Sequence, residues 1–65
     1  MRIIIIIPAY NEAALISKTL DSLLAQTFSA EKIIVVDDGS TDETPQVVAS
    51  YAAKHNSIQL VQKNS

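Results

Sequence analysis

Aromatic, amide and acidic side chains gather at two places in this sequence, and each place directly follows an apolar run. Tyr10, Asn11 and Glu12 follow a run of isoleucines. Asp37 and Asp38 end a second apolar run. An aromatic ring offers a planar base a stacking face, and a carboxylate offers it a charged hydrogen-bond acceptor. The two places together could therefore bind a nucleotide.

A carboxylate in such a site selects among the bases. Uracil and thymine present a ring N3–H, and guanine presents N1–H with its exocyclic amine, whereas cytosine presents an N3 acceptor that a carboxylate repels. The residues therefore favour uridine, thymidine or guanosine nucleotides over cytidine nucleotides.

The phosphates of such a nucleotide have no glycine-rich loop to hold them. Gly39 is the only glycine, so neither a dinucleotide-binding fingerprint nor a P-loop is present. With a net charge of −2, a bound diphosphate needs a divalent cation. Oxygen ligands alone indicate Mg²⁺ or Mn²⁺, although these residues offer no obvious ligands for it.

The composition is that of one small globular domain. The chain has 65 residues, of which 48% are hydrophobic and 18% are charged. Five basic against seven acidic residues exclude a nucleic acid held by a basic surface. The absence of cysteine excludes thiol chemistry and fits a cytoplasmic location.

Three apolar segments predict strands, at Ile3–Ile7, Lys32–Asp37 and Ile58–Gln62. The first two lack polar alternation, so we expect them to be covered on both faces of a parallel sheet. Helical spacing between the strands predicts a β-α-β-α-β order with right-handed crossovers, an α/β fold.

The starts of the two helices can also be predicted. Asn11 is a candidate cap for the first helix. Ser40 and Glu43 have the spacing of a capping box, but we expect the second helix to start between Asp42 and Thr44, because this keeps Pro45 in the first turn.

The carboxyl ends of neighbouring parallel strands meet at one edge of the sheet, where ligands of such folds bind. Side-chain alternation predicts that Asp37 shares a face with Val35, while Asp38 points to the other face. Purely structural roles compete with binding, since Asp38 could belong to a turn before a helix and Tyr10 could cover the strand ends.

Three segments in this order resemble the start of an inverting family-2 glycosyltransferase with a GT-A fold. They are Ile3–Glu12 (IIIIIPAYNE), Leu20–Phe28 (LDSLLAQTF) and Ile33–Asp42 (IIVVDDGSTD). The resemblance extends from Arg2 to Gln62 but corresponds only to the first part of the nucleotide-binding half. A chain this short, without disulfides or a metal cluster, also buries little surface. We therefore interpret residues 1–65 as the N-terminal fragment of a truncated, Rossmann-like nucleotide-sugar-binding domain.

The resemblance implies a role for each matching position. Pro8 and Ala9 would line the base through their backbone, Tyr10 would stack on it or flank it, and Asp38 would accept its ring N–H.

Four further positions have supporting roles by the same resemblance. Glu12, and more weakly Asn11, would lie near the ribose or the base. Asp37 would support the site from the end of the sheet, and Gly39 would permit a tight turn beside the nucleotide.

The implied activity is transfer of a sugar from a UDP-, GDP- or dTDP-sugar to an acceptor hydroxyl with inversion. The acceptor could be a sugar, a lipid-linked sugar or a protein, as in polysaccharide or cell-envelope biosynthesis. No residue here matches the family's catalytic base or its metal motif, so we expect this part alone to be inactive. The parent protein could lie at the cytoplasmic face of a membrane through segments beyond Ser65.

Two other classes of protein remain as alternatives. A receiver-type phosphoacceptor domain also has paired aspartates at a strand end, although there the pair follows the first strand. A non-catalytic nucleotide-binding α/β module is the second alternative. An exposed sheet edge could also lead the fragment to self-associate.

Overall fold

The computed structural model describes residues 3–26 and 30–63. Its five elements are β1 (Ile4–Ala9), α1 (Ala13–Leu24), β2 (Lys32–Asp38), α2 (Thr44–Lys54) and β3 (Ile58–Lys63). The three strands form a parallel sheet in the order β1-β2-β3. The predicted β-α-β-α-β order and α/β fold class are therefore confirmed.

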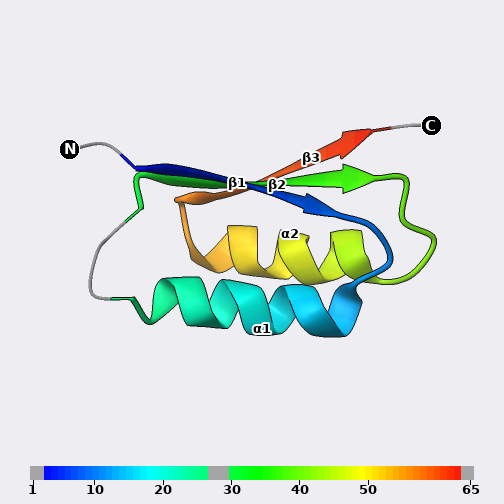
Figure 1. Cartoon of the computed structure of the whole chain (residues 1–65), viewed down its shortest axis with the longest axis horizontal. Helices are drawn as coiled ribbons and strands as arrows, with labels where there is room; N and C mark the ends of the chain where they lie inside the picture. Colours follow the sequence, from blue (N-terminus) through cyan, green and yellow to red (C-terminus); the bar gives the residue numbers. More distant parts are fainter. Residues whose placement is uncertain (1–2, 27–29, 64–65) are drawn as a thin grey trace.

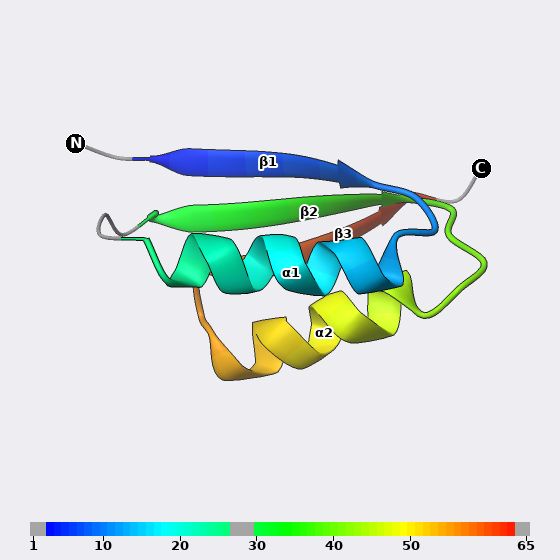
Figure 2. The ribbon, with the colours of Figure 1, turned by 60° about the horizontal axis from the view of Figure 1, so that its bottom comes forward.

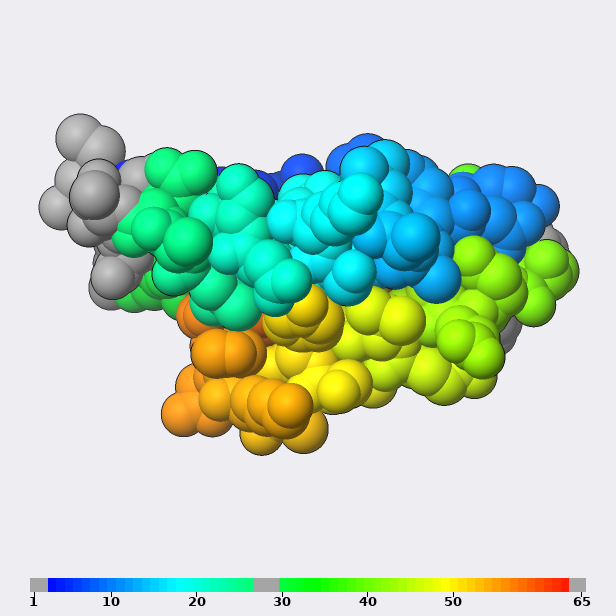
Figure 3. Space-filling model, turned by 90° about the horizontal axis from the view of Figure 1, so that it is seen from below, coloured from blue at the N-terminus to red at the C-terminus, as the bar shows by residue number. Residues whose placement is uncertain are grey.

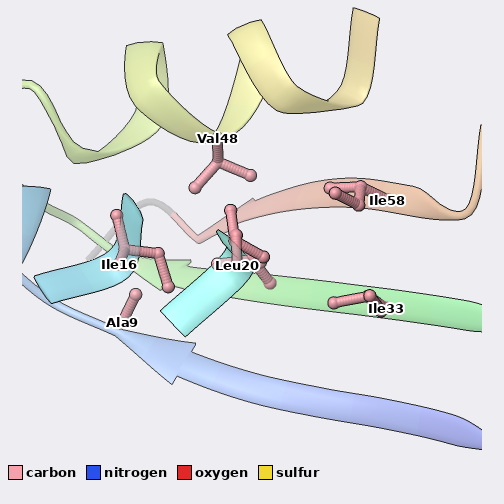
Figure 4. Close-up of a cluster of buried hydrophobic side chains, with 7 residues drawn as sticks. Ala9, Ile16, Leu20, Ile33, Val48 and Ile58 are labelled. Carbon is pink, nitrogen blue, oxygen red and sulfur yellow. The ribbon is translucent and has the colours of Figure 1, made fainter. Parts of the chain in front are cut away.

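Both helices lie on the same face of the sheet (Figures 1 and 2). Consecutive parallel strands joined by crossovers of one hand place both connecting helices on one side. Side chains from both helices and all three strands form the core between these layers, part of which Figure 4 shows. Its buried members are Ala9, Ile16, Leu20, Ile33, Val35, Val48 and Ile58.

The opposite face of the sheet is open, so the prediction that β1 and β2 are covered on both faces is wrong for the described residues. Ile4 and Ile6 are 55% and 65% exposed, and Ile34 and Val36 in β2 are half-buried. An unbroken apolar run fits burial on two faces, but these two helices supply cover for only one.

The helices lie side by side beneath the sheet (Figure 3). The Tyr51 hydroxyl of α2 bonds to the Ser17 carbonyl of α1 at 3.2 Å and to the Asp21 carboxylate at 2.6 Å. The hydrogen bond to Asp21 raises the pKa of the Tyr51 phenol, because it favours the protonated form. These contacts fix α1 against α2 away from the strand ends.

The strands extend slightly beyond their predicted bounds. β1 begins at Ile4 instead of Ile3 and continues two residues past Ile7, through Pro8 to Ala9. Proline is tolerated there because β1 is an edge strand, on which a missing amide donor need not break the ladder. β2 and β3 each end one residue later than predicted.

The predicted start of α2 is confirmed and the predicted cap of α1 is wrong. α2 begins at Thr44 with Pro45 in its first turn. Glu12, and not Asn11, stands at the N-cap of α1, and the Asn11 backbone has a φ of 49°. The Asn11 side chain bonds to a different loop, as described below. Phe28, which closes the second matching segment, lies outside the described residues.

Candidate functional site

The two groups of polar residues meet at the carboxyl edge of the sheet, where the loops after β1 and β2 lie together (Figure 1). Strand register pairs Ala9 with Asp37. Tyr10 and Asp38 are each one residue further along, so they stand at neighbouring strand ends. The structure thus brings together the predicted aromatic residue and the predicted carboxylate.

Asp37 and Asp38 differ in surroundings, as the alternation predicts. Asp37 lies on the helix-covered face and is 2% exposed, whereas Asp38 is exposed. The Asp37 carboxylate accepts hydrogen bonds from the Ser40 backbone amide, at 3.3 Å, and from the Ser40 hydroxyl. Asp37 therefore holds the following loop on the sheet, and only Asp38 has a carboxylate open to a ligand.

Asp38 and Tyr10 are both accessible. The Asp38 carboxylate lies 4.0 Å from the Lys63 ammonium, and both of these side chains are more than 60% exposed. An exposed pair at this distance is screened by water and contributes little to stability. Tyr10 is 55% exposed. Neither side chain is committed to the core, which leaves both available to a bound molecule.

The remaining predicted residues line the same edge. Pro8 is exposed, whereas the Ala9 side chain is 2% exposed, so Ala9 offers a ligand its backbone only. The Glu12 carboxylate accepts a hydrogen bond from the Tyr10 amide at 3.2 Å. Gly39 has a φ of 75°, in the left-handed region that glycine enters without strain.

Asn11 connects the loop after β1 to the loop after β2. Its side-chain oxygen accepts hydrogen bonds from the amides of Thr41, at 2.8 Å, and Asp42, at 3.2 Å. Its own amide donates to the Ser40 hydroxyl at 2.9 Å. The Thr41 hydroxyl also donates to the Asn11 side-chain oxygen, at 3.4 Å. Residues about thirty positions apart are thereby joined by four hydrogen bonds.

Residues at the start of α2 and just before it also cap α1. The Thr44 hydroxyl accepts a hydrogen bond from the Glu12 amide at 2.9 Å, and the Asp42 carboxylate accepts one from the Ala13 amide at 3.3 Å. Asp42 also accepts from the Thr44 amide and hydroxyl. The hydrogen bonds from Thr44, with a smaller contribution from Ala13, lower the pKa of Asp42. The Glu12 and Ala13 amides at the start of α1 therefore already donate to side chains of the protein.

Sequence reasoning did not predict the contacts of this second set of residues, although it placed Asn11 near the ribose or the base. They are polar side chains that bind to the other loop or neighbour Asp38: Asn11, Ser40, Asp42, Thr44 and Lys63. Except for Lys63, which ends β3, their types are typical of helix caps, which led to a local interpretation. The available signal was their position, because both loops follow parallel strands and must therefore meet.

No metal site is formed by the side chains of residues 3–26 and 30–63. At this edge Asp37 is bonded to Ser40 and Asp42 to the helix amides, and no three carboxylates of the described residues come together around one point. The described residues do not fit a bound divalent ion.

A hollow of about 300 Å³ lies between the helices, lined by Asp21, Leu24, Ser50, Tyr51, Lys54 and His55. Its lining comes from the C-terminal halves of α1 and α2 and from His55, which follows α2, at the opposite end of the helices from the loops after β1 and β2. It is therefore separate from the candidate site.

Neither helix in the described part of the chain is long and apolar enough to cross a membrane.

The sequence profile of glycosyl transferase family 2 matches residues 4–65. The chain belongs to this family. Its three-stranded parallel β-α-β-α-β arrangement is that of the N-terminal part of a GT-A, Rossmann-like fold. No solved structure matches the chain significantly.

Curated relatives agree with this assignment. Over 91% of its length the chain is 43% identical to an uncharacterized glycosyltransferase of Mycoplasma pneumoniae. Over 97% it is 42% identical to a poly(ribitol-phosphate) beta-glucosyltransferase of Bacillus spizizenii, and over 72% it is 51% identical to a validoxylamine A glucosyltransferase of Streptomyces hygroscopicus. The chain spans only 20%, 10% and 12% of these proteins, respectively.

Proposed function

We propose that this chain is the nucleotide-binding part of a glycosyltransferase that uses a UDP-, GDP- or dTDP-sugar. One observation carries the proposal: the exposed Tyr10 ring and the exposed Asp38 carboxylate stand at neighbouring strand ends, at the edge where parallel sheets bind ligands. The ring supplies a stacking face and the carboxylate accepts the ring N–H of the base.

The neighbouring residues complete the proposed site. The exposed Pro8 and the Ala9 backbone lie beside the base, and Gly39 lets the next loop turn without a side chain in the way. The Glu12 carboxylate accepts a hydrogen bond from the Tyr10 amide, and this bond orients the loop. The same Glu12 carboxylate lies near the ribose in the proposed site. Asp37 supports the site through Ser40 and does not contact the nucleotide.

In the proposed reaction the acceptor hydroxyl displaces the nucleoside diphosphate at the anomeric carbon, with inversion. A base takes the hydroxyl proton, and the diphosphate leaves with the electron pair of the broken C–O bond. We assign neither the base nor a metal ligand to residues of this chain. Mg²⁺ or Mn²⁺, if the reaction uses one, takes its main ligands from elsewhere in the parent protein.

Donor and acceptor identity are also part of the proposal. Two of the relatives are named as glucosyltransferases, so a glucose nucleotide is the first donor to test. Their names give two different acceptors, so the acceptor class is left to experiment, whether a sugar, a lipid-linked sugar or a protein. A cytoplasmic location, expected from the absence of cysteine and the use of nucleotide sugars, completes the proposal.

Family membership decides against the receiver-type alternative. The non-catalytic alternative predicts nucleotide binding without sugar transfer by the parent protein. Assay of the parent protein with UDP-glucose and with GDP- and dTDP-sugars distinguishes these outcomes.

Nucleotide binding itself is tested by two-dimensional NMR of the 65-residue chain with UDP, GDP and CDP. We expect the amides around Tyr10 and Asp38 to shift with UDP or GDP, and to shift little with CDP. Equal shifts with all three nucleotides would contradict recognition of the base by Asp38.

A further inference from the structure

We propose that Asn11 is a positioning residue for the nucleotide site. It holds the loop after β1 on the loop after β2, so that Tyr10 and Asp38 act as one site. We call Asn11, its hydrogen-bond partner Ser40 and the bonded amides of Thr41 and Asp42 the loop clamp. The inference rests on the proposed function, because it assumes that these loops bind a nucleotide.

The loop clamp is built around a single side chain. The Asn11 side-chain oxygen accepts the amides of Thr41 and Asp42 and, at 3.4 Å, the Thr41 hydroxyl, while its backbone amide donates to Ser40. All four hydrogen bonds go to the other loop. The Ser40 hydroxyl that accepts the Asn11 amide donates in turn to the Asp37 carboxylate. Because Asp37 is 2% exposed, this chain of hydrogen bonds connects the first loop to the core of the sheet.

Helix capping does not explain these bonds. The amides that Asn11 accepts belong to Thr41 and Asp42, whereas α2 begins at Thr44. The accepted amides therefore precede the helix, and their bonding fixes the path of the loop. The Asn11 side chain likewise does not cap α1, where Glu12 stands at the N-cap.

The clamp lies next to both proposed binding residues. Asn11 follows Tyr10 directly, and its φ of 49° sets the direction in which the chain leaves Tyr10. Asparagine tolerates this left-handed conformation better than most residues. On the other loop, Gly39 alone separates Asp38 from Ser40. A change in the clamp therefore alters the distance between the stacking ring and the carboxylate.

Two substitutions of Asn11 distinguish the effect of its backbone conformation from the effect of its side-chain hydrogen bonds. Asn11→Gly tolerates the positive φ but removes the oxygen that accepts two amides. Asn11→Asp keeps an acceptor oxygen at the same place and also tolerates the left-handed region. Both variants therefore tolerate the backbone conformation of residue 11, and only one of them keeps the acceptor oxygen of the loop clamp.

The experiment titrates the wild-type chain and both variants with UDP and with uridine, followed by NMR, and measures amide hydrogen exchange at Thr41 and Asp42. Uridine is included because Asn11→Asp adds a negative charge that acts on phosphates. We expect Asn11→Gly to weaken binding about tenfold, as the loss of one well-formed hydrogen-bond arrangement would. Asn11→Asp should restore uridine binding to within about threefold of wild type, and should restore slow exchange.

Each other result has a definite meaning. If wild type binds and Asn11→Gly binds equally well, or if Asn11→Asp binds uridine as weakly as Asn11→Gly, the clamp is overturned while the proposed function stands. If wild type binds neither ligand, the proposed function fails for this chain. Exchange then decides: faster exchange in Asn11→Gly that Asn11→Asp reverses supports the clamp, and unchanged exchange overturns it.

If circular dichroism shows that Asn11→Gly does not fold, a second pair of variants, at Ser40, tests the clamp. Ser40→Ala removes the hydroxyl that accepts the Asn11 amide, and Ser40→Thr keeps it. The clamp requires weaker binding and faster exchange in the first variant and their recovery in the second. Identical behaviour of the two Ser40 variants would overturn it.

Discussion

The Asp42 carboxylate accepts a hydrogen bond from the backbone amide of Ala13 at 3.3 Å, so a residue in the loop before α2 caps the first turn of α1. The same carboxylate accepts the Thr44 amide at the start of α2. One acidic side chain thus serves the positive ends of both helices, where a negative charge is stabilising. This arrangement ties the first turns of both helices to one side chain at the strand-end edge.

The stability of the chain should depend on pH through Asp42. Hydrogen bonds lower its pKa in the folded state, so its contribution is present above the unfolded pKa, about 3.9, and is lost as pH falls through the folded value. Urea denaturation of wild type and Asp42→Asn over pH 2 to 7 measures this. We expect a difference at neutral pH that disappears in acid. A constant difference would show that the charge of Asp42 is not involved.

Replacement of the buried Thr44 hydroxyl should be costly. Thr44→Val keeps the shape of the side chain but leaves the Glu12 amide without its acceptor. We expect a loss of about 1 to 3 kcal/mol in the free energy of unfolding, measured in urea. Ser22→Ala is the control, because Ser22 is exposed on α1 and the loss of its hydroxyl should change the free energy of unfolding by less than about 0.5 kcal/mol. Equal losses would contradict the role given to Thr44.

Truncation of a side chain should lower the free energy of unfolding by different amounts on the two faces of the sheet. Leu20→Ala removes a fully buried side chain between the layers and should cost about 2 to 5 kcal/mol. Ile6→Ala acts on a side chain that is 65% exposed and should cost less than about 1 kcal/mol. Chemical denaturation of both variants provides the comparison. A cost for Ile6→Ala as large as that of Leu20→Ala would mean that the open face is covered.

Nucleotide selectivity should depend on Asp38 and much less on Asp37. Asp38→Asn replaces an acceptor by a group that can also donate, so UDP binding should weaken by about 10- to 100-fold while CDP binding improves. Asp37→Asn should lower stability instead, because it weakens the bonds to Ser40 inside the fold. NMR titration of both variants measures the two effects. Unchanged UDP affinity in Asp38→Asn would remove Asp38 from the site.

Much of the fold follows from the sequence by itself. The apolar runs, the spacing of Ile16 and Leu20 and the position of Pro45 determine the order of strands and helices. They do so because periodicity and proline act locally. Side-chain alternation along β2 likewise places Asp37 and Asp38 on opposite faces of the sheet. Tyr10 is expected near them because the carboxyl ends of neighbouring parallel strands meet at one edge.

Only the tertiary structure decided which residues hold the two loops together. Asn11 and Asp42 have side chains that can cap a nearby helix, and local reasoning assigns them to that role. In the fold they bond to residues about thirty positions away, because parallel strands bring both loops to one edge. The open face of the sheet was decided in the same way: an isoleucine run such as that around Ile6 specifies apolar surroundings, but the handedness of the crossovers determines which face the helices cover.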